Sequence, residues 1–221
     1  MPDIFDEIAE DLRTERALRL AKRYGGLLVL ALILVLVGVG VRAYYASYRG
    51  HQAEQAATRY LALTKDVDNN ATPPAPADAA KAAQALSDFA ATAPQGYKTL
   101  ADLRAAALYM QAGHRAKAAD LWNAVGRDGN ADPLLRDLAN LLWAQHELGH
   151  APDSQVLARL SPLAKADDPF NALARETQAM AYLRQGNQDM AKSLLSALSN
   201  DPNAPQSVRT RAGGLLAQLK G

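Results

Sequence analysis

The chain has 221 residues, of which 49% are hydrophobic and 21% are charged, and its formal net charge is +1. This near-neutral balance argues against a nucleic-acid-binding protein, and the absence of cysteine excludes disulfides, thiolate zinc sites, iron–sulfur clusters and a cysteine nucleophile. Alanine is abundant and isoleucine occurs only at positions 4, 8 and 33, which predicts an all-α protein that is not an enzyme.

Residues 1–23 predict an amphipathic arm. Ile4, Phe5, Ile8 and Leu12 recur at helical spacing, with acidic residues in the first turns and basic residues in the last. Two interpretations stay open for this arm. It is either a solvated continuation of the helix that follows, or a docking helix for a cytoplasmic or membrane partner.

Residues 24–45 predict a transmembrane helix. No charged residue occurs between positions 24 and 41, and a helix of that length rises about 27 Å, close to the thickness of the hydrocarbon core. Tyr44, Tyr45 and Tyr48 then follow where an interfacial aromatic belt is expected. The long arm before the apolar run and the poor cleavage site after it favour an uncleaved anchor over a signal peptide, and a buried core helix is the other alternative.

The basic residues near the two ends of this span predict its orientation. Residues 9–23 carry five Lys or Arg, whereas residues 42–56 carry two. The excess of positive charge marks the cytoplasmic side. In a bacterium, the chain is therefore expected to be a single-pass inner-membrane protein with residues 1–23 in the cytoplasm and residues 46–221 in the periplasm.

Beyond the span, short helical patterns alternate with glycine and proline at a regular spacing. Gly113, Gly149 and Gly186 lie 36 and 37 residues apart. A period of this length with Tyr, Gly, Ala and an aromatic residue in that order is the signature of the tetratricopeptide repeat (TPR). The residues that repeat after 73 positions are Tyr109, Gly113, Ala118 and Trp122, matched by Tyr182, Gly186, Ala191 and Leu195.

This pattern predicts a TPR-like α-solenoid of about four helical hairpins within residues 46–221. In the third hairpin, Gln145 and Ser154 stand where Tyr and Ala are expected, which leaves its packing open. A Pro-rich loop is expected at 69–77, and a closing helix at 206–220 is expected to cover the last apolar face. The predicted hairpins are 42–66 with 78–92, 99–112 with 115–127, 134–148 with 153–166, and 171–185 with 188–199.

The N-terminal sequence carries a more specific resemblance. The run PDIFDEIAEDLR from Pro2 to Arg13, followed by KRYG at 22–25 and a single anchor, resembles the ancillary SecYEG translocon subunit family (YfgM-like). The resemblance implies a non-catalytic inner-membrane scaffold, without cofactors, that assists protein export and periplasmic folding in a chaperone-like role. It implies as partners the Sec translocon, a membrane-anchored prolyl isomerase and exported polypeptides. A TPR adaptor in envelope assembly or cell division is an alternative.

The sequence His146-Glu147-Leu148-Gly149-His150 matches the H-E-x-x-H motif of zinc proteases, in which two histidines on one helix face bind the metal. Gly149 and the proline at 152 predict that His150 lies beyond the end of the helix. A membrane-tethered zinc metalloprotease is therefore the weaker alternative, and adventitious zinc binding at the motif stays open. No catalytic, cofactor or metal residue is expected.

The first helices of TPR hairpins line a concave face that binds peptides or partner helices. Trp143 with methionines on either side suits adaptable contact with apolar segments, although Trp143 could equally pack between helices. Positions in the first helices are matched by their distance before the three glycines, and those expected on the concave face make up the predicted partner-binding groove. Its residues are Leu103, Met110, Gln111, Arg136, Trp143, His146, Glu147, Glu176, Met180 and Arg184.

Overall fold

The computed structural model describes residues 34–45, 47–65, 67 and 72–219, which fall into two units, 1–54 and 55–221. The predicted arm, 1–23, and residues 24–33 of the predicted span lie outside the described residues. Within the described residues every regular element is a helix, and the only β feature is an isolated bridge between Leu148 and Ala151. The predicted all-α class is confirmed.

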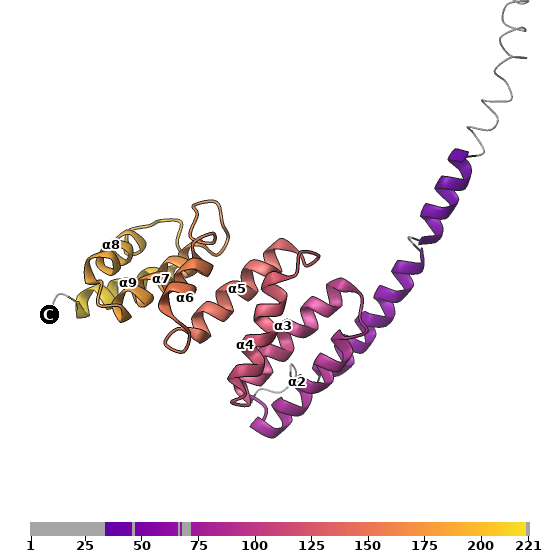
Figure 1. Ribbon diagram of the computed structural model, residues 1–221, viewed down its shortest axis with the longest axis horizontal. Coiled ribbons are helices and arrows are strands. Elements are labelled where there is room, and N and C mark those ends of the chain that lie inside the picture. The colour runs from indigo at the N-terminus through magenta and orange to yellow at the C-terminus, as the bar shows by residue number, and fades with distance from the viewer. Residues whose placement is uncertain (1–33, 46, 66, 68–71, 220–221) are drawn as a thin grey trace, which may run out of the picture. The chain divides into compact units, whose positions relative to one another are not determined.

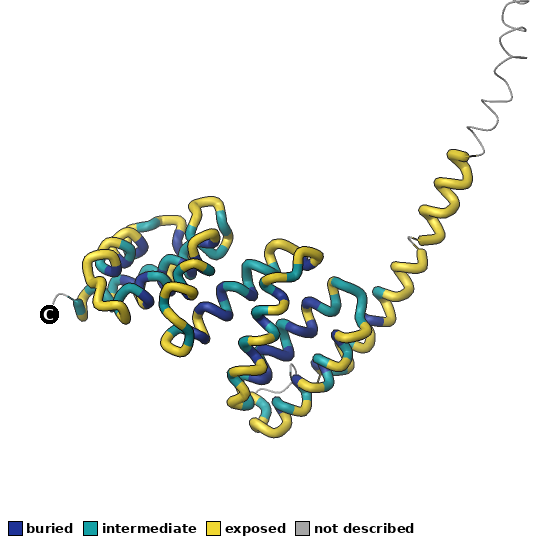
Figure 2. The backbone as a smooth tube through the Cα atoms, in the orientation of Figure 1, coloured by how far each residue is buried: buried dark blue, intermediate teal, exposed yellow. Residues whose placement is uncertain are grey.

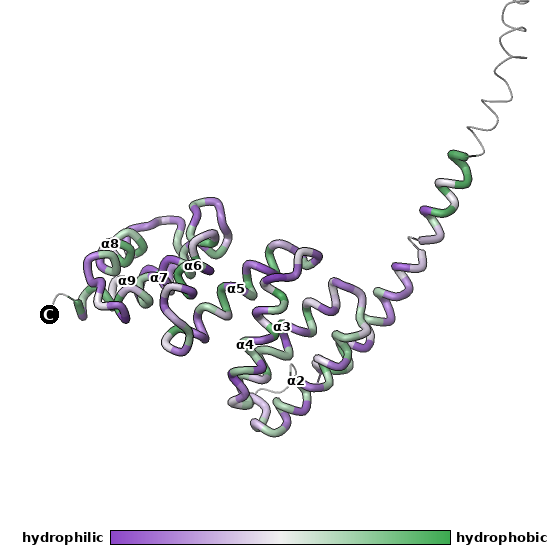
Figure 3. The backbone as a smooth tube through the Cα atoms, in the orientation of Figure 1, coloured by the Kyte–Doolittle hydropathy of each residue, from purple (hydrophilic) through white to green (hydrophobic). Residues whose placement is uncertain are grey.

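In the first unit, residues 34–45 and 47–54 are helical. Figure 3 shows the apolar residues at the start of this segment, and their large side chains, including Leu34, Leu36 and Val39, are exposed. Searched over the described residues alone, no helix is both long and apolar enough to cross a membrane. The transmembrane prediction for residues 24–45 extends beyond those residues and stays a prediction.

The second unit begins with helical residues 55–65. The helices that follow lie beside one another in the order in which they occur along the chain (Figure 1). Each helix from α2 to α9 packs on the next, and α7 also contacts α5 and α9. Contacts between alternate helices are the geometry of stacked hairpins, as the repeat pattern predicts. The helices are α2 (Pro76–Ala90), α3 (Gln95–Gln111), α4 (Arg115–Arg127), α5 (Pro133–Glu147), α6 (Asp153–Leu160), α7 (Asn171–Arg184), α8 (Gln188–Ser199) and α9 (Gln206–Gln218).

Two helix boundaries differ from the sequence prediction by four residues or more, and the others by two or fewer. α3 begins at Gln95 instead of Thr99, because Pro94 is fixed in a conformation that leads into the helix and its carbonyl accepts the Lys98 N–H at 2.9 Å. α6 ends at Leu160 instead of residue 166. Pro162 has no backbone N–H to continue the helical hydrogen bonds, and residues 161–164 form a turn instead.

The core of the second unit is built largely from alanine and leucine on the faces where helices meet (Figure 2). Ala106, Ala118, Ala179 and Ala191 are fully buried, as expected for residues that let paired helices approach closely. Large side chains fill the remaining space, with Trp122 the largest of the fully buried ones. One cluster extends from α2 to α7, and a second joins α7, α8 and α9.

The first helices of the second and fourth hairpins, α3 and α7, end in the same way. At the end of α3, the His114 N–H donates to the Tyr109 carbonyl at 2.8 Å and the Gly113 N–H donates to the Met110 carbonyl at 3.0 Å. The same two bonds recur around Gly186. This is the Schellman motif, and it requires the left-handed φ of +78° at Gly113 and +76° at Gly186.

α5 ends differently, in a type II turn. Leu148 is extended (φ −57°, ψ 117°), Gly149 has a φ of +85°, and the His150 N–H donates to the Glu147 carbonyl at 2.8 Å. A Cβ added at Gly149 would lie 2.8 Å from Nη1 of Arg184, whereas at the other two glycines it would meet nothing within 4 Å. The third hairpin thus departs from the repeat pattern at this turn.

Replacing each of the three glycines by alanine tests this difference. Gly113→Ala and Gly186→Ala should each lower the free energy of unfolding by about 1–2 kcal/mol, because alanine is strained at positive φ. Gly149→Ala should lower it by up to about 1 kcal/mol more, because the new methyl displaces Arg184 from its hydrogen bond to Asp153 (3.3 Å). Urea unfolding of the full-length chain in mild detergent, followed by circular dichroism, measures all three.

The variant Arg184→Ala supplies the control. In that background Gly149→Ala should cost no more than Gly113→Ala, because the displaced side chain is gone. An extra cost of Gly149→Ala that persisted without Arg184 would contradict this account.

Candidate functional site

A groove of about 560 Å³ opens between α5, α7 and α9. These are the alternate helices that contact one another in the second half of the repeat unit. Leu148, Met180 and Leu215 give the groove an apolar lining, and Met180 is 42% exposed. The remaining lining residues are Gln145, Glu176, Thr177, Arg211, Gly214 and Gln218.

Helical spacing accounts for how α9 lines this groove. Arg211, Leu215 and Gln218 are four and three residues apart on α9, so their side chains form one stripe along the helix. Leu215 also packs against the small core of α7, α8 and α9, which fixes the stripe in place. A Cβ at Gly214 would meet no atom within 4 Å, so the absence of a side chain there leaves the groove open above α9.

Glu176 and Arg211 are the charged residues of the groove lining, and they pair with each other. Arg211 donates from Nε to Oε1 and from Nη2 to Oε2 of Glu176, each at 2.6 Å. The hydrogen bond to Glu176 raises the pKa of Arg211. With both charges satisfied, the groove offers apolar side chains and neutral amides, a surface suited to binding an apolar segment and not to acid–base chemistry.

Two of the predicted groove residues, Glu176 and Met180, lie in this groove. The predicted residues of α5 face other helices instead. Trp143 is only 9% exposed, and the guanidinium carbon of Arg159 on α6 lies 3.9 Å from its ring centroid. The His146 ring stacks on Trp122 of α4, with centroids 4.8 Å apart. Trp143 therefore packs in the main core, and it also lines a second groove, between α4, α5 and α6.

Helix geometry explains the separation of these α5 residues from the groove. Trp143 precedes Gln145 by two residues, so at about 100° per residue the two side chains point to nearly opposite sides of α5. Glu147 lies on the Trp143 side and accepts hydrogen bonds from Nη1 of Arg115 at 3.0 and 3.1 Å. Gln145 and Leu148 line the groove in their place.

The other predicted residues lie outside the groove lining. Leu103 and Met110 of α3 are half-buried against the main core, and Gln111 is exposed at the end of that helix. Arg136 is half-buried on α5. Arg184 is exposed at the end of α7 and donates to Asp153 at 3.3 Å.

The zinc-protease motif does not lie on one continuous helix. α5 ends at Glu147 and His150 follows the type II turn, as the glycine and proline predict. His146 is stacked on Trp122 and Glu147 is paired with Arg115. Within the part of the chain that the structure describes, no three His, Cys, Asp or Glu side chains gather where a metal ion could be held. The donor set therefore does not fit a catalytic zinc site.

The groove residues of α9 were not anticipated from the sequence, which predicts this helix as a closing element. Two signals could have found them. Arg211, Leu215 and Gln218 share one helix face, and Arg211 lies 35 residues after Glu176, which is one repeat length. A charge pair at the repeat spacing indicates neighbouring positions on adjacent first helices.

Trp143→Ala tests the placement of this residue in the core. The substitution should lower the free energy of unfolding by about 3–5 kcal/mol, because it removes a buried indole and leaves a cavity. Met180→Ala, at the corresponding position of α7, should cost less than about 1 kcal/mol because that side chain is largely exposed. Urea unfolding measures both, and equal small costs would show that Trp143 is not core.

His146 should make the stability depend on pH. Burial lowers the pKa of His146 below its ordinary value of 6.5, so the unfolded chain binds a proton more readily than the folded one. The free energy of unfolding should therefore fall as the pH falls below about 6.5, and less so in His146→Gln. Urea unfolding of both proteins between about pH 7.5 and pH 5.5 measures the difference.

Comparison with known proteins gives one match. The tetratricopeptide repeat-like domain family matches residues 20–205, which include every helix from α2 to α8. No curated protein and no solved structure matches the chain. The family match agrees with the stacked hairpins, the buried alanines and the glycine-terminated first helices described above. The chain belongs to the tetratricopeptide repeat-like domain family.

Proposed function

We propose that this chain is a membrane-anchored, non-catalytic scaffold that binds protein segments in the groove between α5, α7 and α9. The groove itself is the observation that carries the proposal. It is apolar, its two charged residues are paired, and an exposed methionine lies within it. Methionine adapts its shape to varied apolar partners, which suits a site for unfolded or partly folded polypeptides.

We further propose that the scaffold works beside the Sec translocon and assists export and periplasmic folding of secreted proteins. Three features of the sequence support this placement. They are the apolar run at 24–41, the excess of basic residues before it, and the resemblance of residues 2–13 to an ancillary translocon subunit. Exported chains emerge unfolded and expose apolar segments of the kind that the groove would hold.

Purification of the tagged full-length chain from native membranes in mild detergent tests this function. The wild type should recover translocon subunits, a membrane-anchored prolyl isomerase and exported polypeptides. Met180→Glu should reduce recovery of exported polypeptides about fivefold or more, because it places an unpaired charge in the apolar groove. Quantitative mass spectrometry of the recovered proteins measures the effect.

Met190→Glu is the matched control, because Met190 on α8 is 45% exposed and lies outside the groove lining. It should recover the same proteins as the wild type. Equal losses in both variants would contradict the groove as the binding site. Recovery of envelope-assembly or division proteins in place of translocon subunits would contradict the proposed association with the Sec translocon. It would not contradict the proposal that the groove binds protein segments.

A further inference from the structure

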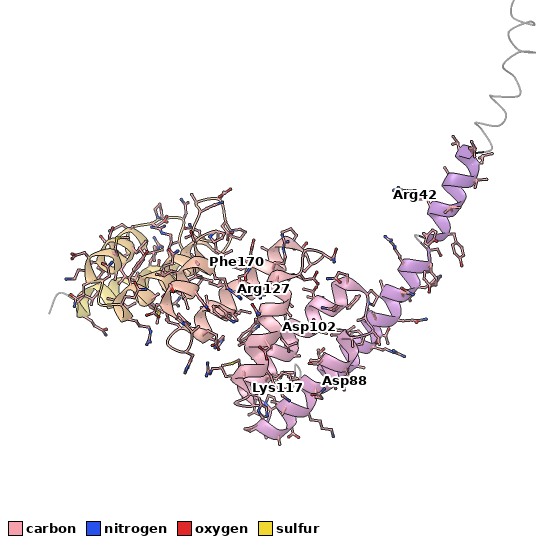
Figure 4. The ribbon with its side chains drawn as sticks, viewed as in Figure 1. Arg42, Asp88, Asp102, Lys117, Arg127 and Phe170 are labelled. Carbon is pink, nitrogen blue, oxygen red and sulfur yellow. The ribbon has the colours of Figure 1, made fainter. Side chains whose placement is uncertain are left out.

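A second groove, of about 460 Å³, lies between α4, α5 and α6, and it has a different chemistry. Three arginines line it: Arg115 and Arg127 from α4, and Arg159 from α6. Arg115 is paired with Glu147. Within the described residues, neither Arg127 nor Arg159 forms an ion pair. Figure 4 shows Arg127 at the opposite end of α4 from Lys117.

Arg159 is held in position, but one of its hydrogen-bond donors lacks an acceptor among the described residues. Its guanidinium lies over the Trp143 ring, and Nη2 donates to Oδ1 of Asn123 at 2.5 Å. Its Nη1 is buried, and no described residue accepts a hydrogen bond from it. A buried donor without an acceptor costs free energy, more so on a charged group, so Arg159 would gain a hydrogen bond if a small side-chain shift let a ligand oxygen reach this nitrogen.

The lining around Arg159 adds a second arginine, Arg127, for which the described residues offer no ion pair. Burial lowers the pKa of Arg159, and the like charge of Arg127 lowers it further. Besides Glu147, the acidic residue of the groove lining is Asp120, which lies two helical turns before Arg127, about 10 Å along α4. Among the described residues it forms no ion pair with Arg127 or Arg159. Two arginines that line one groove and form no ion pair among the described residues are a site that an external anion would stabilise.

We propose that this groove binds a carboxylate of an acidic segment in a partner protein, held between Arg127 and Arg159. Planar guanidinium groups match a carboxylate in both charge and geometry. The groove also carries Glu147 and Asp120, which disfavour a polyanion such as nucleic acid, and Arg159 already covers one face of Trp143. This site is separate from the apolar groove of α5, α7 and α9 and does not depend on the function proposed there.

Binding of a defined peptide to the full-length chain in mild detergent tests the proposal. The probe is a short fluorescein-labelled peptide in which glutamate alternates with alanine, compared with the same peptide carrying glutamine at each glutamate. Fluorescence anisotropy should show binding of the acidic peptide and about tenfold weaker binding of the neutral one. Arg127→Gln should weaken binding of the acidic peptide about tenfold and leave the helical circular dichroism unchanged.

Lys117→Gln is the control, because it removes the same charge from the same helix but outside the groove lining. It should leave binding unchanged. Equal binding of the two peptides, or equal losses in Arg127→Gln and Lys117→Gln, would overturn the proposal. Stronger binding of a labelled single-stranded oligonucleotide than of the acidic peptide would also overturn it. Met180→Glu should not change binding of the acidic peptide, so the experiment tests this groove independently of the apolar groove.

Discussion

The close approach of helices through buried alanines is the constraint on which the rest of the structure depends. Ala118, Ala144 and Ala179 are fully buried where helices meet, and they leave no room for a larger side chain. Because the helices approach so closely, each hairpin can contact the next one along the chain. The stacking then brings alternate helices together, and the apolar groove exists only because α5, α7 and α9 converge in this way.

The two grooves use different physical means to present a binding surface. In the groove of α5, α7 and α9, Glu176 and Arg211 neutralise each other, so the energy of binding would come mainly from burial of apolar area. In the groove of α4, α5 and α6, Arg127 and Arg159 form no ion pair with any described residue, so charge would dominate and salt would weaken binding. A scaffold with both grooves could hold two chemically different segments at once, or one segment that is acidic in part and apolar in part.

The helices were largely predictable from the sequence, whereas the site was predictable only in part. The regular spacing of glycine and proline predicted the hairpins and the closing helix, because those residues act locally on the backbone. Counting back from the glycines placed Met180 in the groove of α5, α7 and α9, whereas Trp143 lies on the opposite side of α5 and lines the groove of α4, α5 and α6. Trp143 and Met180 lie the same number of residues before their glycines, but Arg159 of α6 covers the Trp143 ring whereas Met180 is 42% exposed. Such a difference lies in tertiary packing and not in local sequence.

The ion pairs at the ends of α5 and α7 constrain the order of the hairpins. Glu147 and Arg184 each lie two residues before a turn glycine, and each pairs with the start of the second helix in the preceding hairpin, at Arg115 and Asp153 respectively. The charges are reversed between these two equivalent pairs. If the middle hairpin were deleted, Arg184 would face Arg115, and two like charges would meet where an ion pair now stands. The repeats are therefore not interchangeable modules, because shortening the array in this way would bring like charges together where an ion pair now forms.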